Sequence, residues 1–146
     1  MWGLLLDVGG VLDGARADVE VLTAYVAELR SRGVRTALLS NDPGGPGGEP
    51  LRRLGDGRFV DEVVLSGDVG VAKPDSRIYR HAAAQLDLDP GQCVFVDDLA
   101  VNVRGAVAVG MVGVHHTDTA TTVAELRILF DHEFGHGHVG TGDSGE

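Results

Sequence analysis

Short runs of consecutive apolar residues recur along the chain, and each has the length of a strand that is buried on both faces. Between these runs, apolar residues recur every three or four positions, which is the spacing of an amphipathic helix. The runs are GLLLDV (3–8), RTALLS (35–40), CVFVDD (93–98) and VGVHH (112–116), with DEVVLS (61–66) as a candidate fifth. Strands that alternate with helices predict an α/β fold: a doubly wound, Rossmann-like parallel sheet flanked by helices.

The helical segments have recognisable ends. In the first of them, apolar positions extend from Val21 to Leu29, and Gly33 follows as a stop signal. Asp75 is placed to cap a later helix. The pattern predicts helices over residues 17–32, 49–55, 75–86, 99–109 and 120–130.

A chain of 146 residues is long enough for one compact domain and short for two. We expect the folded core to comprise residues 1–131. The sequence HEFGHGHVGTGDSGE, residues 132–146, lacks apolar periodicity and predicts a flexible tail. Its HEFGH segment matches a zinc-protease pattern, but Gly135 interrupts it and ten residues follow it, so we interpret the segment as part of the tail.

The chain carries 22 acidic and 12 basic residues, a formal net charge of −10. Nucleic acids and anionic membranes bind clustered Lys and Arg, so this charge disfavours both as partners. The sequence shows neither a basic-then-apolar leader nor an apolar run of membrane-spanning length, and we therefore expect a cytoplasmic protein. Cys93 is the one cysteine, which excludes an internal disulfide. The oligomeric state is left open.

Polar residues that directly follow the predicted strands are the candidate functional residues, because open parallel sheets bind ligands at the carboxyl ends of their strands. Neighbouring carboxylates repel one another unless a cation lies between them, and Mg²⁺ prefers such oxygen ligands. A lysine, a hydroxyl and an amide can bind phosphoryl oxygens, and a carboxylate can attack phosphorus. In chain order the candidates are Asp7, Ser40, Asn41, Lys73, Asp97 and Asp98.

Taken singly, each candidate also has a purely structural interpretation. A carboxylate after a strand can cap the next helix, as Asp97 and Asp98 could do. Ser40 and Asn41 could shape a turn, and the lysine could be an exposed loop charge. The combination of all of them in order favours the functional interpretation.

The candidates lie in four ordered motifs, LLLDVGGVL, TALLSN, VAKPDSRIY and CVFVDDLAVNVRGA. Together these motifs resemble those of the haloacid dehalogenase-like (HAD) superfamily, over residues 2 to about 115. The resemblance implies a hydrolase, specifically a Mg²⁺-dependent phosphatase that acts through an aspartyl-phosphate on an unidentified phosphorylated substrate. Residues 1–131 would then be the catalytic core.

The resemblance also implies a role for each residue on the phosphoryl side of the site. Asp7 would be the nucleophile. Ser40 would hold the transferring phosphoryl group, with Asn41 beside it. Lys73 would neutralise the nucleophile and the phosphate.

On the metal side, the resemblance makes Asp7 a ligand of Mg²⁺ and adds the backbone carbonyl of Gly9. Asp98 would bind the same ion, with Asp97 beside it. Asn102 follows Asp98 by one helical turn and would orient the ligands.

Gly9 is the main departure from the family pattern. HAD phosphatases usually carry a second aspartate at this position, two residues after the nucleophile, where it acts as general acid and base. A positioned acid or base contributes roughly 10² to 10⁴ in rate, so its loss allows the alternative of a non-catalytic module that binds metal and phosphate. Asp13 and Asp42 are candidate substitutes. A 2-haloacid dehalogenase also lacks the second aspartate, but such enzymes do not keep the acidic pair of the fourth motif.

The intervals from Asp7 to Ser40 and from Ser40 to Lys73 each accommodate one helix and its connections, with no room for a cap domain. We therefore expect an open site. Such a site favours a macromolecular or extended phosphorylated substrate, or a cap supplied by another subunit. His115 and His116 end the last strand. One of them lying at the rim of the site is an alternative, but we expect this strand-end pair to face solvent.

Overall fold

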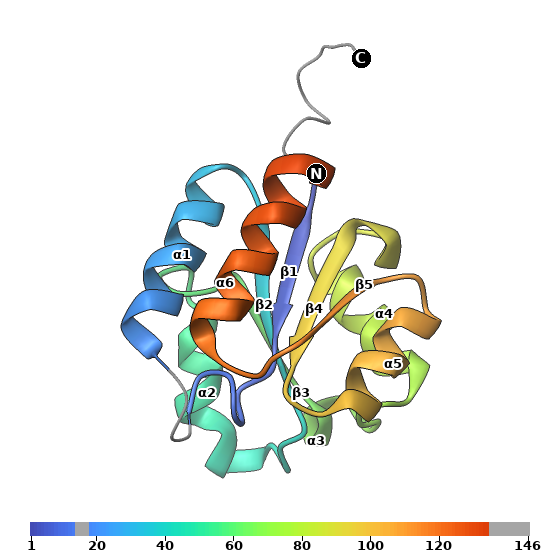
Figure 1. The fold of residues 1–146 in the computed structure, drawn as a ribbon. Coiled ribbons are helices and arrows are strands. Elements are labelled where there is room, and N and C mark those ends of the chain that lie inside the picture. The colour runs from blue at the N-terminus through green and yellow to red at the C-terminus, as the bar shows by residue number, and fades with distance from the viewer. Residues whose placement is uncertain (14–17, 135–146) are drawn as a thin grey trace.

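Five parallel strands form one sheet in the order β3-β2-β1-β4-β5 (Figure 1). The structure is a computed structural model that describes residues 1–13 and 18–134, with side chains up to residue 131. The strands are β1 (Gly3–Leu6), β2 (Arg35–Ser40), β3 (Glu62–Leu65), β4 (Cys93–Asp97) and β5 (Val112–His115). All five predicted strands are confirmed, and every neighbouring pair is parallel.

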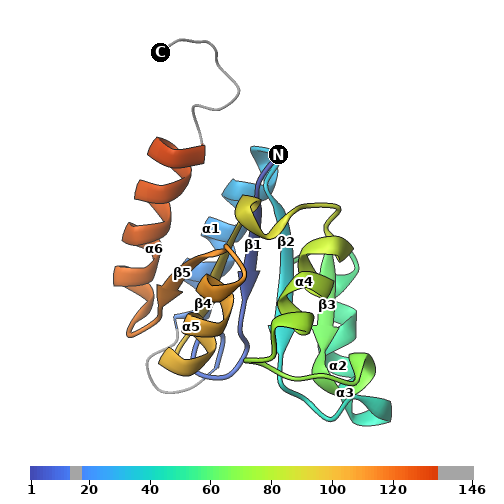
Figure 2. The same ribbon diagram turned by 90° about the vertical axis from the view of Figure 1, so that its right-hand side faces the viewer.

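Helices cover both faces of the sheet, as the doubly wound fold requires (Figures 1 and 2). The helices α1 (Val19–Ser31) and α6 (Thr119–Ile128) pack on one face, and α4 (Ser76–Gln85) and α5 (Ala100–Ala108) pack on the other. Two short helices, α2 (Glu49–Arg52) and α3 (Ser66–Val69), lie toward the carboxyl ends of the strands, at the lower end of both views.

Short irregular helical turns complete the chain. The predicted helix over 49–55 consists of α2 and a 3₁₀ turn, and α6 continues as a π-helical turn instead of ending near 130. Helix α3 was not predicted, because four residues are too few to show a period. The turns are η1 (Gly45–Gly48), η2 (Arg53–Gly55), η3 (Pro90–Gln92) and η4 (Leu129–Phe134).

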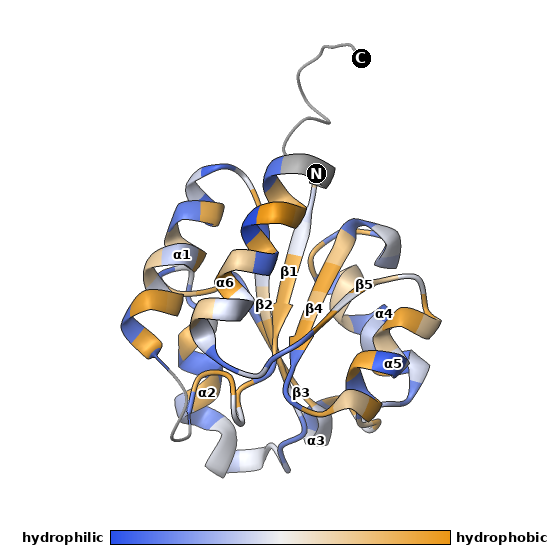
Figure 3. Ribbon diagram, in the orientation of Figure 1, coloured by the Kyte–Doolittle hydropathy of each residue, from blue (hydrophilic) through white to orange (hydrophobic). Residues whose placement is uncertain are grey.

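The central strand β1 supplies both layers of the core by simple alternation. Leu4 and Leu6 pack with the α1 and α6 side, whereas Leu5 packs with the α4 and α5 side, and all three are fully buried. Burial of one such side chain stabilises the fold by roughly 1.5 to 3 kcal/mol. Figure 3 shows the hydrophobic strands at the centre and hydrophilic residues on the outer helices.

Aspartates cap three of the long helices, α1, α4 and α6, which explains where these helices begin. Asp18 accepts a hydrogen bond from Val21 N at 3.2 Å at the start of α1. Asp75 accepts from Arg77 N at 2.9 Å, which confirms its predicted role as the cap of α4. Such a cap contributes typically about 1 kcal/mol. Within residues 1–13 and 18–134, no helix has the length and apolarity needed to cross a membrane.

Candidate functional site

A pocket of about 530 Å³ lies at the carboxyl ends of the strands, and residues from all four sequence motifs line it. The strand order explains this meeting, because β1 lies between β2 and β4. The predicted residues in the pocket wall are Asp7, Gly9, Ser40, Asn41, Lys73 and Asp98, and Asn102 joins them. Asp97 is absent from the wall because its side chain is fully buried beneath it.

Asp7 extends β1 by one residue toward the fourth motif. Its backbone N–H donates to Val96 O at 2.9 Å, which continues the pairing of β1 with β4. The register that pairs Leu6 with Val96 therefore places Asp7 beside Asp97. Two carboxylates meet at the base of the pocket, as predicted from neighbouring strand ends.

Lys73 is the cation between these two carboxylates. Its Nζ lies 2.7 Å from Asp7 Oδ1 and 2.8 Å from Asp97 Oδ2, and it also donates to Leu39 O at 2.9 Å. The side chain is 1% exposed. An ammonium has three donors on one atom, and all three have an acceptor here. The predicted alternative of an exposed loop charge is therefore wrong for Lys73.

Asn41 holds the loop that carries Lys73. Its Oδ1 accepts from the backbone N–H of Lys73 at 2.9 Å, and its Nδ2 donates to the carbonyl of the same residue at 3.1 Å. Both ends of the amide are thus engaged by one peptide segment. The contact makes Asn41 a positioning residue, and its predicted direct binding of phosphate stays a prediction. Ser40, at the end of β2, lines the pocket next to it.

Asp97 is the most enclosed acidic residue of the site, with no exposed surface. Its Oδ1 accepts from Leu99 N at 2.9 Å. Its Oδ2 accepts from Lys73 Nζ at 2.8 Å and from Asn102 Nδ2 at 3.2 Å. Tyr79 in turn donates its hydroxyl to Asn102 O at 2.6 Å. Since these donors use both oxygens of Asp97, its carboxylate is suited to positioning Lys73 and Asn102.

Asp98, by contrast, is half-buried and faces the pocket. One carboxylate oxygen from each of Asp7, Asp97 and Asp98 lies within 4.8 Å of the other two. The pocket-facing oxygens of Asp7 and Asp98 suit Mg²⁺, and the buried Asp97, whose oxygens already accept hydrogen bonds, adds negative charge beside them. The donor set therefore fits the metal that the resemblance implies.

The pKa shifts in the acidic cluster of Asp7, Asp97 and Asp98 also favour a bound cation. Burial raises the pKa of Asp7 to about 6, although the neighbouring Lys73 opposes the shift. Burial also raises the pKa of Asp98, and the adjacent Asp97 adds to that rise. Each shift disfavours the charged form, and a bound cation favours it.

Gly10 allows the first motif to approach Asp98. Its φ is +76°, in the left-handed region that favours glycine, and a Cβ atom built there would overlap the Asp98 carboxylate. Gly9, one residue earlier, is different, because no atom in the described part of the chain lies within 4 Å of a Cβ atom built there. Asp13 and Asp42, the candidate substitutes for the missing aspartate, both line the pocket.

The prediction that His115 and His116 face solvent is wrong for His116. This residue is buried, its backbone N–H donates to Asp97 O at 2.8 Å, and its Nδ1 lies 2.7 Å from Thr122 Oγ1 in α6. His115 is exposed, but its Nε2 lies 2.9 Å from the carbonyl oxygen of Asp98. The sequence could not indicate these contacts, because they depend on the pairing of β5 with β4 and on the position of α6.

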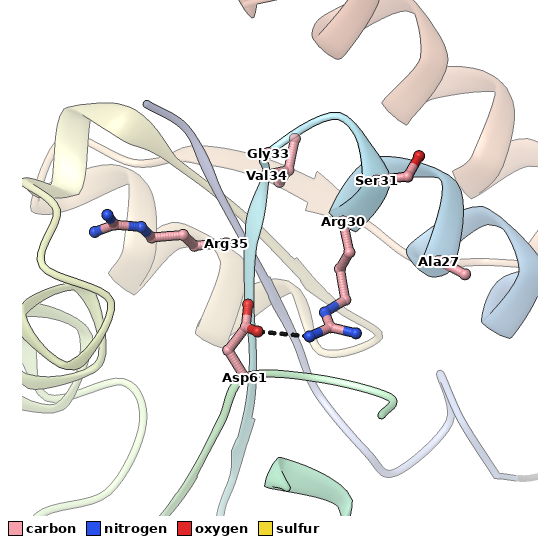
Figure 4. Close-up of a pocket in the computed structure, with 7 residues that line it drawn as sticks. All are labelled: Ala27, Arg30, Ser31, Gly33, Val34, Arg35 and Asp61. Atoms are coloured by element: carbon pink, nitrogen blue, oxygen red, sulfur yellow. Dashed lines mark hydrogen bonds and ion pairs between the residues drawn. The ribbon is translucent and has the colours of Figure 1, made fainter. Parts of the chain in front are cut away.

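A second pocket, of about 470 Å³, lies at the other end of β2, where α1 ends and β3 approaches (Figure 4). Arg30 and Asp61 point toward each other and form an ion pair at 2.7 Å, whereas Arg35 points away from them. Asp61 also accepts from Thr36 N at 2.9 Å. Burial alone would raise the pKa of Asp61, but the hydrogen bonds from Arg30 and Thr36 lower it. These contacts tie α1 to the sheet edge.

Comparison with known proteins agrees with the fold and the motifs. Residues 3–110 match the family model of the haloacid dehalogenase-like hydrolases. The chain is 38% identical over 109 residues to "Sesquiterpene phosphatase astK" of Aspergillus oryzae, and the match covers 74% of this chain and 55% of that relative. The chain thus spans about half the length of this curated relative.

Solved structures show the same architecture. The crystal structure of an uncharacterized protein from Corynebacterium glutamicum is 44% identical, with a TM-score of 0.85, and the match covers 90% of this chain and 96% of the other. A HAD family enzyme from Bacteroides thetaiotaomicron, in complex with magnesium and inorganic phosphate, has a TM-score of 0.57 at 16% identity, over 80% of this chain and 94% of the other. At that identity the second likeness shows the fold alone.

Proposed function

The chain belongs to the haloacid dehalogenase-like hydrolase family, and from this premise we propose that it is a Mg²⁺-dependent phosphatase that acts through an aspartyl-phosphate on Asp7. The observation that carries the proposal is the position of Lys73 Nζ, within 2.8 Å of both Asp7 and Asp97 at the base of an open pocket. A cation at this position offsets the charge of a carboxylate that must approach an anionic phosphoryl group. The phosphatase name of the relative from Aspergillus oryzae supports the same reaction class.

In the proposed reaction, a carboxylate oxygen of Asp7 forms a bond to phosphorus while the bond from phosphorus to the leaving oxygen breaks. Water then attacks the aspartyl-phosphate, which releases inorganic phosphate and restores Asp7. Because the pKa of Asp7 is about 6, the carboxylate is largely ionised at neutral pH and available for attack. From the base of the pocket, the charge of Lys73 would offset that of the phosphoryl group, and the hydroxyl of Ser40 would donate to its oxygens.

The carboxylates of Asp7 and Asp98 and the backbone carbonyl of Gly9 would hold Mg²⁺, with Asp97 as the residue that positions its neighbours. When bound, the ion supplies positive charge at the phosphoryl oxygens and orients them. The spacing of the three carboxylates supports this assignment, since their oxygens lie within 4.8 Å of one another. The magnesium and phosphate complex of the fold relative from Bacteroides thetaiotaomicron is compatible with it.

The open pocket bears on the substrate. α1 is the one helix described between Asp7 and Ser40, and β3 with short helical turns fills the chain from Ser40 to Lys73. Because no cap is inserted at either place in the described residues, we favour a macromolecular or extended phosphorylated substrate, or a cap contributed by another subunit. The net charge of −10 disfavours a nucleic acid.

Gly9 supports one alternative, a HAD-fold module that binds metal and phosphate without turnover. The side chain that usually transfers the proton is absent there, whereas the acidic cluster is complete. A 2-haloacid dehalogenase is less favoured, because the Asp97 and Asp98 pair is retained and engaged.

Hydrolysis of p-nitrophenyl phosphate with and without Mg²⁺ tests the proposal. We expect turnover with Mg²⁺, loss of turnover on addition of a chelator, and no turnover by Asp7→Asn. Asp87→Asn is the matched control, since Asp87 is exposed on the loop after α4 and has a φ of 57° that asparagine adopts easily. Equal background rates in wild type and Asp7→Asn would overturn the phosphatase.

Calorimetry separates the binding module from the enzyme. Tight binding of beryllofluoride in the presence of Mg²⁺, combined with no hydrolysis of any phosphate ester in a panel, would establish the module instead. Halide release from a 2-haloacid in the presence of chelator would establish the dehalogenase.

A further inference from the structure

The pocket lacks a side chain at the position where a proton donor is expected. Gly9 is exposed in the pocket wall, and among residues 1–13 and 18–134 no atom lies within 4 Å of a Cβ atom built there. A phosphatase with this site needs another group to protonate the leaving oxygen, because an alkoxide is a poor leaving group.

The loop after β1 brings one carboxyl group to the wall of the same pocket. Val8 O accepts hydrogen bonds from Val11 N at 3.3 Å, Leu12 N at 2.9 Å and Asp13 N at 3.3 Å, which folds residues 8–13 into one tight turn. This turn places Gly9 and Asp13 in the wall of the same pocket.

A hydrogen bond fixes the carboxyl group of Asp13 at the pocket. Its Oδ1 accepts from the backbone N–H of Gly10 at 3.1 Å, and Asp13 lines the same pocket as Asp7. Since Oδ1 is used by Gly10, Oδ2 is the oxygen that can carry a proton. Asp13 is exposed, which suits a group at the mouth of the pocket, where a leaving group in line with Asp7 would exit.

Asp42 is the competing carboxyl group in the pocket wall. Its Oδ1 accepts from Gly44 N at 2.8 Å, and its backbone is bound to Ser66 and Gly67. It therefore belongs to the loop that follows Ser40, on the side where the phosphoryl oxygens would be held. It does not belong to the turn that contains Gly9.

We propose that Asp13 is the general acid and base of this site and takes over the task of the side chain missing at Gly9. The inference rests on the phosphatase function proposed above. When Asp7 attacks phosphorus, the bond to the leaving oxygen breaks and that oxygen takes the proton of the Asp13 carboxyl group, which gives the free alcohol. The Asp13 carboxylate then accepts a proton from the attacking water, the bond between phosphorus and Asp7 breaks, and inorganic phosphate leaves.

The test compares two leaving groups. p-Nitrophenolate leaves without protonation, whereas an alkoxide from a simple alkyl phosphate does not. In Asp13→Asn we expect kcat/KM for the alkyl phosphate to fall by about 10² to 10⁴, and kcat/KM for p-nitrophenyl phosphate to change by less than about threefold. The variant should also release a burst of p-nitrophenol equal to the enzyme concentration, because the second step has lost its base.

Two further variants separate catalysis from folding. Asparagine can still accept the Gly10 N–H through its own Oδ1, so Asp13→Asn should keep the melting temperature of wild type. The double variant Gly9→Asp/Asp13→Asn should recover most of the alkyl phosphate activity, because the space at Gly9 is open. Asp87→Asn should match wild type with both substrates.

The possible outcomes are distinguishable. An equal fall with both substrates, or no fall with either, would overturn the role of Asp13 while leaving the phosphatase intact. The same would follow if Asp42→Asn, instead of Asp13→Asn, selectively lost the alkyl phosphate. No Mg²⁺-dependent hydrolysis of either ester by wild type would overturn the proposed function itself, and this inference with it.

Discussion

Lys73 Nζ donates a hydrogen bond of 2.7 Å to Asp7 Oδ1 at the buried base of the pocket. This contact joins two motifs that are far apart in the sequence. It is the central interaction of the site, because the same ammonium also binds Asp97 and the carbonyl of Leu39.

Lys73→Met removes the charge but keeps much of the side-chain volume. Loss of one partner of a buried ion pair costs about 3 to 5 kcal/mol, so the free energy of unfolding should fall by that order. Phosphatase kcat/KM should fall by about 10² to 10³. Lys73→Arg should also be impaired, because a planar guanidinium cannot present three donors from one atom. An arginine variant with activity within tenfold of wild type would show that charge alone suffices.

Asp7→Asn should be more stable than wild type at pH 7.5 when no Mg²⁺ is present. The folded pKa of about 6 lies above the value near 3.9 of an unfolded aspartate, so wild type loses stability as the pH rises between these two values. The gain of the variant should therefore be small at pH 4, grow up to about pH 6, and then stay constant at about 3 kcal/mol. Urea titrations at several pH values measure it. A variant less stable than wild type at all pH values would contradict the expectation.

Gly9 and Gly10 form a matched pair of adjacent glycines. Gly9→Ala should change the free energy of unfolding by less than about 1 kcal/mol, because the added methyl group meets open space. Gly10→Ala should cost about 1 to 3 kcal/mol for its positive φ and should displace Asp98. We expect weaker Mg²⁺ binding by calorimetry in Gly10→Ala alone. Equal Mg²⁺ affinity in the two variants would argue against Asp98 as a ligand.

His115 is expected to support the metal site through the Asp98 backbone. Its Nε2 lies 2.9 Å from Asp98 O, a contact that fixes the turn carrying the carboxylate when Nε2 bears the proton. His115→Ala should raise the half-saturating Mg²⁺ concentration by about tenfold and leave kcat at saturating Mg²⁺ nearly unchanged. His115→Gln keeps a donor and should behave more like wild type. A fall in kcat with no change in the Mg²⁺ requirement would speak against this role.

Asp61 is expected to govern acid stability at the other end of β2. Because the pKa of Asp61 is lowered in the folded state, its contribution is present above the unfolded value near 3.9 and is lost as the pH falls through the lower folded value. Asp61→Asn keeps an acceptor for Thr36 N and loses the partly exposed ion pair with Arg30, which is worth about 1 kcal/mol or less. Asp61→Ala also leaves Thr36 N without this acceptor and should cost about 1 to 3 kcal/mol. Thermal melts at pH 7 and pH 3 give the comparison, and the deficit of both variants should shrink at pH 3.

Local patterns predicted most of the fold because buried positions recur as a periodic pattern of apolar residues in the sequence. The run GLLLDV predicts β1 because both faces of that strand are covered, and Asp75 predicts the start of α4 because a cap acts on its own helix. Helix α3 has only four residues, which are too few to show such a pattern. The prediction that His116 faces solvent was wrong because Thr122 and α6 bury this residue. The apolar pattern of the strand gives no information about a contact with a helix.

The same limit applies to the site. The sequence identifies Asp97 and Asp98 as a pair, but their different environments depend on what surrounds each one. Lys73 and Asn102 enclose Asp97, while Asp98 faces the pocket. The engagement of the Asn41 amide by the backbone of Lys73 likewise needs two loops that meet in space.

By itself, the sequence determined the order of strands and helices and the chemistry available at each strand end, because these depend on the period of burial and on residue type. Only the tertiary structure decided which of those residues touch. The placement of β1 between β2 and β4 brings Asp7 against Lys73 and Asp97, and the turn after β1 places Gly9 and Asp13 in the wall of the same pocket. Such contacts are set by long-range packing, which a local pattern does not record.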